Sequence, residues 1–274
     1  MAASFLIMLR EGLEAALIVG IILAYLAKTG HRSRSGSVWT GTLAAVLMSI
    51  LAGGLIFMTA GSIDGRAEEL FEGIAMLTAA AVLTYMIFWM RRQALNIRAH
   101  LQAQVNTAIE SGSGLALGLL AFVAVGREGI ETALFLFAAA QAASPYATTL
   151  GGVLGLGTAA VLGYLLYRGT YRMNLRAFFN VTSVLLLLFA AGLLAHGIHE
   201  FHEAAVIPAV IEQVWDINPV LDEASTLGSF LKAIFGYNGN PSLVEVLAWV
   251  GYLVLVGGAY FRPATARELQ LLRA

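Results

Sequence analysis

The chain has 274 residues, of which 59% are hydrophobic and 12% are charged, and its mean hydropathy is +0.79. Soluble domains carry about 25% charged residues, so this composition excludes a soluble globular protein and predicts a membrane protein. The net charge of -1 argues against a nucleic-acid partner, and the absence of cysteine excludes disulfides, thiolate metal sites and cysteine nucleophiles.

Several apolar stretches are long enough to cross a bilayer, which takes about 20 residues each. We therefore predict an all-α polytopic membrane protein with seven transmembrane helices. Its first span is expected to be retained, because no basic region precedes the apolar run as in a signal peptide. The sequence GGVLG at 151–155 has the small-xxx-small spacing of closely packed helices. The spans are expected at 3–26, 38–60, 70–90, 114–138, 147–167, 178–199 and 243–261.

Basic residues indicate which connections lie in the cytoplasm, because cytoplasmic loops are enriched in Lys and Arg. With seven spans, 12 of the 16 basic residues fall on one side, which predicts an external N-terminus and a cytoplasmic C-terminus. Arg66 and Lys232 fall on the other side. The 12 residues are Lys28, Arg32, Arg34, Arg91, Arg92, Arg98, Arg168, Arg172, Arg176, Arg262, Arg267 and Arg273.

Two connections are long. The cytoplasmic connection, 91–113, is expected to extend the third span as a helix that ends at Gly and Ser residues. The external loop, 203–242, contains short amphipathic pieces interrupted at Pro208, Pro219 and GYNGNPS, and it is either a cap or docking surface or a plain connector. The last segment, 243–274, is expected to hold the seventh helix and a cytoplasmic tail.

Two related motifs interrupt the apolar sequence, LREGLEAAL at 9–17 and GREGIETAL at 126–134. They lie 117 residues apart, in the first and fourth spans, which cross the membrane in opposite directions in a seven-span protein. This spacing predicts an inverted repeat of two three-helix units, 1–90 and 114–202. Inverted repeats of this kind place a site near the bilayer midplane, at the interface between the units.

Each motif gathers charged side chains on one helix face. Glu11 and Glu14 are i,i+3 neighbours, and Arg10 can pair with Glu14 at i,i+4. Each charge at mid-helix costs about 2.5–3.5 kcal/mol on membrane insertion, so these side chains must face a polar interior or a bound cation. The second motif repeats the arrangement in Arg127, Glu128 and Glu131.

The chemistry of the motifs suits a hard cation. Carboxylate oxygens favour Mg, Ca, Mn or ferric ions, and no sulfur ligand accompanies them. The arginines are expected to hold the glutamates ionised and to moderate their charge. Gly12 and Gly129 leave bare backbone that another helix or an ion can approach. The structural alternative is that the motifs are salt bridges that fasten helices together.

Weaker candidate ligands lie at the outer face. Glu72 is one turn beyond Glu68 at the start of the third span, and it is either a ligand at the mouth or a solvated charge. The sequence AHGIHEFHEA ends the sixth span with residues that would capture a metal ion before transport or would form a solvated helix end. These residues are His199, Glu200, His202 and Glu203.

The motifs, together with FLIMLREGLEAALIV, ELFEGI, FWMRR, REGIETALF and FHEA, resemble those of the oxidase-dependent iron permeases, the family of the fungal high-affinity iron permease and its bacterial counterparts. The likeness covers nearly the whole chain. It implies iron transport into the cytoplasm through the bacterial inner membrane, with no enzymatic activity, no permanent cofactor, and periplasmic iron-binding or iron-oxidising partner proteins. By the motif match it implies that the iron ligands are Glu11, Glu14, Glu128 and Glu131, supported by Arg10 and Arg127, with a weaker role for Glu72.

We therefore expect a high-affinity permease for ferric iron, or for ferrous iron oxidised at the outer face. If the motif carboxylates, Glu72 and both motif arginines are all ionised, their charge of -3 balances Fe(III). One alternative is a permease for another hard divalent cation such as Mn, including a proton-coupled carrier. The other is a membrane-embedded di-iron oxidoreductase, which is disfavoured because no Glu is followed by a His three residues later.

Overall fold

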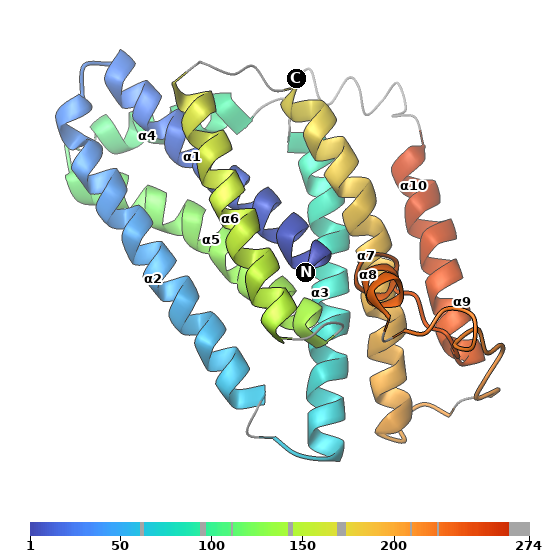
Figure 1. Ribbon diagram of the computed structural model, residues 1–274. Helices are drawn as coiled ribbons and strands as arrows, with labels where there is room; N and C mark the ends of the chain where they lie inside the picture. The colour runs from blue at the N-terminus through green and yellow to red at the C-terminus, as the bar shows by residue number, and fades with distance from the viewer. Residues whose placement is uncertain are drawn as a thin grey trace. The chain divides into compact units, whose positions relative to one another are not determined.

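A computed structural model describes the chain in segments that exclude several short connections and the last residues. All regular elements in the described residues are helices, as the predicted all-α class requires (Figure 1). Two compact units form, and each combines segments from both halves of the sequence: unit 1 comprises 1–68 and 96–182, and unit 2 comprises 69–95 and 183–274. The described residues are 1–60, 63–93, 97–110, 112–141, 145–168, 174–208, 210–223 and 225–262.

Unit 1 is built from helices of both predicted repeats. α1 packs along α6, α2 packs along α5, and α1 and α5 also contact each other. Apolar side chains of α1, α2, α4 and α5 form its core, in which Leu26, Val38, Val105 and Leu117 are inaccessible to solvent. The helices are α1 (Ala2–Lys28), α2 (Ser35–Ala60), α4 (Ile97–Glu110), α5 (Gly114–Gln141) and α6 (Pro145–Tyr167).

Glycines allow close helix contacts in unit 1. A Cβ atom at Gly41 of α2 would overlap the carbonyl oxygen of Gly118 on α5. On α6, Cβ atoms at Gly151 and Gly155 would overlap the backbone at the start of α1. The close packing predicted from GGVLG is thereby confirmed, and it holds α6 against the helix that carries the first motif.

Unit 2 is built around α3 and α7, which approach at Gly73 and Gly197. A Cβ on either glycine would lie 3.2 Å from the carbonyl oxygen of the other. Arg91, near the end of α3, donates hydrogen bonds to the carbonyl oxygens of Tyr260 and Arg262, so these two helix ends lie together. A π-helical turn, Leu253–Gly257, continues α9 into α10. The helices are α3 (Arg66–Gln93), α7 (Leu175–Glu203), α8 (Thr226–Phe235), α9 (Leu243–Tyr252) and α10 (Gly258–Phe261).

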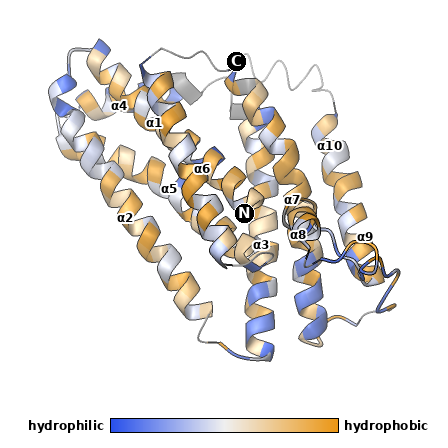
Figure 2. Cartoon of the chain, in the orientation of Figure 1, coloured by the Kyte–Doolittle hydropathy of each residue, from blue (hydrophilic) through white to orange (hydrophobic). Residues whose placement is uncertain are grey.

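Among the described residues, five helical segments are long and apolar enough to cross a membrane, and they coincide with five of the predicted spans. The chain is accordingly a multi-pass membrane protein, and apolar residues dominate α2 along its length (Figure 2). α1 and α5 have 27 and 28 residues, but each carries the three charges of a motif. The count of seven spans therefore stays a prediction. The five segments are Arg32–Ala60, Arg66–Arg91, Tyr146–Tyr167, Ala177–Glu203 and Leu243–Phe261.

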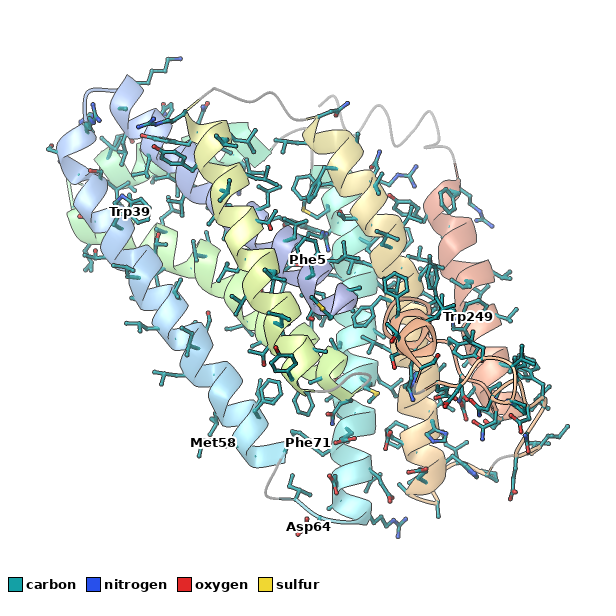
Figure 3. All side chains as sticks on the ribbon, in the orientation of Figure 1. Phe5, Trp39, Met58, Asp64, Phe71 and Trp249 are labelled. Carbon is teal, nitrogen blue, oxygen red and sulfur yellow. The ribbon has the colours of Figure 1, made fainter. Side chains whose placement is uncertain are left out.

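Side chains at the two ends of α2 show how little of this helix is covered. Trp39 and Met58 lie at opposite ends of α2 and are 51% and 76% exposed (Figure 3). Apolar side chains that remain exposed on a transmembrane helix are suited to contact with lipid. The buried side of α2 is the narrow face toward α5, which includes Gly41 and Ala45.

The long connections partly follow the predictions. The helix expected in the cytoplasmic connection is α4, which ends before Gly112. Its packing on α1 and α5 was not predicted, and Tyr25 fixes it by donating a hydrogen bond of 2.7 Å to Asn106. In the loop predicted to be external, α8 ends at Phe235, and its C-cap Gly236, the first residue of GYNGNPS, has a left-handed conformation with φ of 68°. The predicted basic residues Arg172, Arg267 and Arg273 lie outside the described residues.

Candidate metal centre

The first motif lies in α1 and is enclosed. Arg10, Glu11 and Glu14 are at most 5% exposed, and their neighbours Leu9 and Leu13 are also buried. Arg10 Nη1 lies 3.6 Å from Glu11 Oε1, and Arg10 Nε lies 3.3 Å from Glu14 Oε1. The predicted i,i+4 pair is therefore present, and one guanidinium serves two carboxylates.

The second motif lies in α5 and repeats this pairing in a more open setting. Arg127 Nε donates a hydrogen bond of 2.9 Å to Glu131 Oε1 and lies 3.7 Å from Glu128 Oε1. The Arg127 side chain is 40% exposed, whereas Arg10 is fully buried. The two motifs share a sequence pattern but differ in access to their surroundings.

The contact between α1 and α5 brings the two motifs together. One carboxylate oxygen from each of Glu11, Glu128 and Glu131 lies within 4.8 Å of the other two. Opposite oxygen ligands of a hard cation are about 4–5 Å apart, because each metal–oxygen distance is about 2.0–2.6 Å. Three of the four predicted motif ligands thus converge, whereas Glu14 is outside this group of three and is paired with Arg10.

We call Glu11, Glu14, Glu128 and Glu131 the inner carboxylate cluster. Buried polar atoms are normally hydrogen-bonded, yet five oxygens of this cluster make no hydrogen bond within the described structure. The three guanidinium nitrogens of Arg10 also make none, although they form ion pairs. An unsatisfied buried group costs about 1–3 kcal/mol, and more when it is charged. This arrangement suits a bound cation with accompanying water.

The motif glycines provide contacts with neighbouring helices. A Cβ atom at Gly12 would lie 2.9 Å from the Cβ of Ala159 on α6. At Gly129 it would overlap the Ser49 hydroxyl on α2. The prediction that bare backbone lets another helix approach is confirmed, and the partner in each case is a helix without a motif.

A groove of about 480 Å³ opens beside the second motif, on the surface of unit 1. Arg127 and Glu131 of the second motif contribute to its lining. Its other lining residues come from α2 and α5 and are mostly apolar: Met48, Phe122, Val123, Gly126 and Ile130.

The predicted outer ligands lie in unit 2, where hydrophilic residues mark the ends of α3 and α7 (Figure 2). His199 Nε2 lies 3.2 Å from Glu203 Oε1, whereas His202 Nδ1 lies 3.0 Å from a backbone carbonyl oxygen. The carboxylates of Glu72 and Glu203 lie close enough to Glu200 to interact with it electrostatically. In the described part of the chain, three ligand atoms do not converge here as they do in unit 1.

One residue that was not predicted from the sequence holds His199 in place. Glu245, at the start of α9, is 3% exposed, and its Oε1 lies 3.1 Å from His199 Nδ1. Ser242 and Glu245 form a capping box, whose SLVE sequence signals a helix start. No comparable signal relates Glu245 to a histidine 46 residues earlier in the chain.

The helical architecture and the inner carboxylate cluster together define a multi-pass membrane protein with buried acidic side chains gathered from two helices. The chain belongs to the iron permease FTR1 family, whose model matches residues 1–267. The resemblance predicted from the paired motifs is confirmed by this match.

Relatives at high identity cover almost the whole chain. Proteins named ferrous iron permease EfeU from Escherichia coli O6:K15:H31 (strain 536) and Shigella sonnei are each 43% identical to it over 268 residues, which is 97% of both chains. The protein of that name from Yersinia pestis is 40% identical over 265 residues, covering 96% of this chain and 94% of the relative. No solved structure matches the chain significantly.

Proposed function

We propose that this protein moves iron into the cytoplasm through a bacterial inner membrane and binds the ion at the inner carboxylate cluster. The observation that carries the proposal is the convergence of Glu11, Glu128 and Glu131 on one point, with buried oxygens that make no hydrogen bond. Membership of the iron permease family and the names of the relatives support iron as the substrate.

The charge of the cluster favours Fe(II). Its four carboxylates and the two motif arginines leave an excess of two negative charges when all are ionised. Glu72, which the sequence-based sum included, belongs to unit 2 and is not counted in the inner carboxylate cluster of unit 1. Transport of Fe(III), or oxidation at the outer face, would need a further anionic ligand or a partner protein. Mn(II) has the same charge and also accepts oxygen ligands, so it is the second candidate substrate.

The arginines moderate the affinity of the site. Each forms ion pairs with both glutamates of its own motif, which reduces the negative charge that an ion meets. Conduction requires binding that is favourable enough for capture and weak enough for release. Arg127 lines the groove, so we expect it to move away when Glu131 binds an ion, whereas the enclosed Arg10 stays with α1.

The packing of unit 1 supports the proposed inverted repeat. If α1 corresponds to α5 and α2 to α6, the contact of α1 with α6 is the counterpart of the contact of α5 with α2. The motif glycines follow the same exchange, since Gly12 faces α6 and Gly129 faces α2. We retain seven spans, an external N-terminus and a cytoplasmic C-terminus. The hydrogen bonds from Arg91 to the end of α10 support this, because they place two basic helix ends together.

The alternatives fit the site less well. Salt bridges that only fasten helices would be expected to satisfy their buried atoms, whereas most of the cluster's oxygens make no hydrogen bond. A di-iron oxidoreductase would usually add histidine ligands, and the converging group contains only carboxylates. We further propose that periplasmic iron-binding or iron-oxidising proteins deliver iron at the external loop, as the family resemblance implies.

Uptake of radiolabelled, ascorbate-reduced iron into proteoliposomes tests the proposal. Glu11→Gln and Glu131→Gln should each lower the initial rate by at least about 100-fold, because even residues that only orient a metal ligand are worth about 10–100-fold. Glu110→Gln is the matched control, because this carboxylate lies exposed at the end of α4 in the same unit. Incorporation of each variant is equalised before the rates are compared.

Competition experiments in the same proteoliposomes identify the transported ion. Excess Mn(II) and chelated Fe(III) are added in separate experiments as competitors or as alternative substrates. Saturable Fe(II) uptake that both substitutions abolish supports the permease. Full uptake in both variants would show that the motifs only fasten helices together. Preferential uptake of Mn(II) would identify Mn(II), not iron, as the substrate.

A further inference from the structure

Glu245 is held by more hydrogen bonds than a helix cap requires. Its Oε1 accepts hydrogen bonds from Ser242 Oγ at 2.8 Å and from the Ser242 N–H at 3.4 Å. Its Oε2 accepts a hydrogen bond of 2.7 Å from Asn238 Nδ2. The Ser242 N–H and the Asn238 amide nitrogen can only donate, so both oxygens act as acceptors and the buried side chain is a carboxylate in a fixed orientation.

This fixed carboxylate orients the imidazole of His199, which belongs to α7. Because a carboxylate only accepts hydrogen bonds, His199 Nδ1 must carry a proton and donate it to Glu245 Oε1 across 3.1 Å. The other ring nitrogen, Nε2, then points to Glu203 Oε1 at 3.2 Å. Glu203 lies one turn later on the same helix, so α7 itself sets the spacing between His199 and Glu203.

Access and charge on the Nε2 side suit a cation. The side chains of His199 and Glu203 are 39% and 53% exposed, whereas that of Glu245 is 4% exposed. Glu200 adds a further carboxylate that interacts electrostatically with His199, Glu203 and Glu72. Metal-binding histidines almost always donate their second ring N–H to a carboxylate, a backbone carbonyl or water. His199 has this arrangement, and its Nε2 lies beside a second carboxylate, that of Glu203.

We propose that His199 and Glu203 form a second metal site, at the C-terminal end of α7, for a divalent transition ion such as Fe(II) or Mn(II). Glu245 is the positioning residue that fixes the tautomer and the ring, and water completes the coordination. A mixed nitrogen and oxygen ligand set suits a borderline divalent ion better than Fe(III). Its role as a capture site for uptake rests on the proposed function, whereas the binding itself does not.

The ligand chemistry separates this site from the inner carboxylate cluster, which has no imidazole. The full chain is purified with an affinity tag free of histidine, loaded with Mn(II), and measured by electron spin echo envelope modulation. The expected result is a ¹⁴N coupling from a directly bound imidazole. It should disappear in His199→Gln and persist in His202→Gln, a matched control three residues away whose Nδ1 contacts a backbone carbonyl.

Glu245→Gln tests the positioning role. We expect the affinity for Mn(II) to fall about 10–100-fold, with the ¹⁴N coupling restored at saturating Mn(II), because the ligands themselves remain. Unchanged affinity would assign Glu245 to helix capping alone. Bound Mn(II) without ¹⁴N coupling in the wild type, or a coupling lost in His202→Gln but not in His199→Gln, would overturn the site. These outcomes leave the uptake assay on Glu11 and Glu131 to decide the proposed function separately.

Discussion

Two buried polar groups in this protein differ in whether their polar atoms form hydrogen bonds. In unit 1 the inner carboxylate cluster has five oxygens without a hydrogen bond, and the three guanidinium nitrogens of Arg10 are equally without one. In unit 2 both oxygens of Glu245 accept hydrogen bonds, from Ser242, Asn238 and His199. The polar atoms of the first group are largely without hydrogen bonds, whereas those of the second are hydrogen-bonded within the protein.

The difference indicates what each group contributes. A hydrogen-bonded buried carboxylate stabilises the fold and fixes its neighbours, whereas an unsatisfied one lowers stability unless a ligand compensates it. We therefore expect substitutions in the inner carboxylate cluster to affect transport more than stability. Substitutions at Glu245 should affect stability and the orientation of His199.

Removal of Arg10 should have the largest effect on stability. Arg10→Gln leaves two buried carboxylates without their shared cation, and breaking a buried ion pair from one side costs about 3–5 kcal/mol. Arg127→Gln is the matched substitution in the second motif. Its effect should be clearly smaller, because Arg127 is 40% exposed and an exposed ion pair contributes less to stability than an enclosed one. Apparent Tm in detergent without metal measures both, and equal losses would show that the two motifs share one environment.

Neutral substitutions should shift stability in opposite directions in the two groups. In metal-free protein, Glu11→Gln removes one of several mutually repelling buried charges and should raise the apparent Tm. Glu245→Gln should lower it, because a hydrogen bond to a charged group is worth about 1.5–3 kcal/mol. Addition of Fe(II) should stabilise the wild type more than Glu11→Gln. A fall in Tm for both variants would contradict the distinction between an unsatisfied and a satisfied group.

Much of this arrangement could be predicted from sequence, for identifiable reasons. Arg10, Glu11 and their counterparts in α5 interrupt long apolar runs, so their charge was evident without any structure. The motif repeat indicated that the helices meet. The position of Glu14 outside the converging group depends on side-chain conformation, which helical spacing does not give. Glu245 lies next to an ordinary cap sequence, and its contact with His199 depends on how α7 and α9 pack.

Close packing beside the second motif should be sensitive to a single methyl group. Gly129→Ala places its Cβ on the Ser49 hydroxyl, so the apparent stability should fall within the range of about 1–3 kcal/mol for overpacking. Ser49→Gly in the same chain should restore it. Gly157→Ala on α6 is the matched control, because nothing lies within 4 Å of its added Cβ. Equal effects at Gly129 and Gly157 would show that α2 and α5 are not in close contact at the motif.

Acid should weaken the loop at 203–242, which is predicted to be external, through Glu223, and this is the smallest effect that we expect. Burial alone would raise the pKa of Glu223, but hydrogen bonds from Lys232 Nζ at 2.9 Å and from the Gly239 N–H at 2.7 Å lower this pKa below its ordinary value of 4.5. Because the folded pKa is lower than the unfolded one, Glu223 stabilises the loop above the unfolded pKa. That stabilisation is lost as the pH falls through the folded pKa.

Amide hydrogen exchange at Gly239, corrected for the intrinsic effect of pH, measures this loss. Protection should be constant from neutral pH to about pH 5 and should decrease as the pH falls below the unfolded Glu pKa of about 4.3, and Glu223→Gln should show reduced protection at neutral pH with a flatter pH profile. Glu212→Gln, at an exposed carboxylate of the same loop, should keep the wild-type profile. If Glu223→Gln also keeps that profile, the contact with Lys232 contributes no stability. This loop is then held by its neutral hydrogen bonds, such as the one of 2.9 Å from Trp249 Nε1 to the Phe235 carbonyl oxygen.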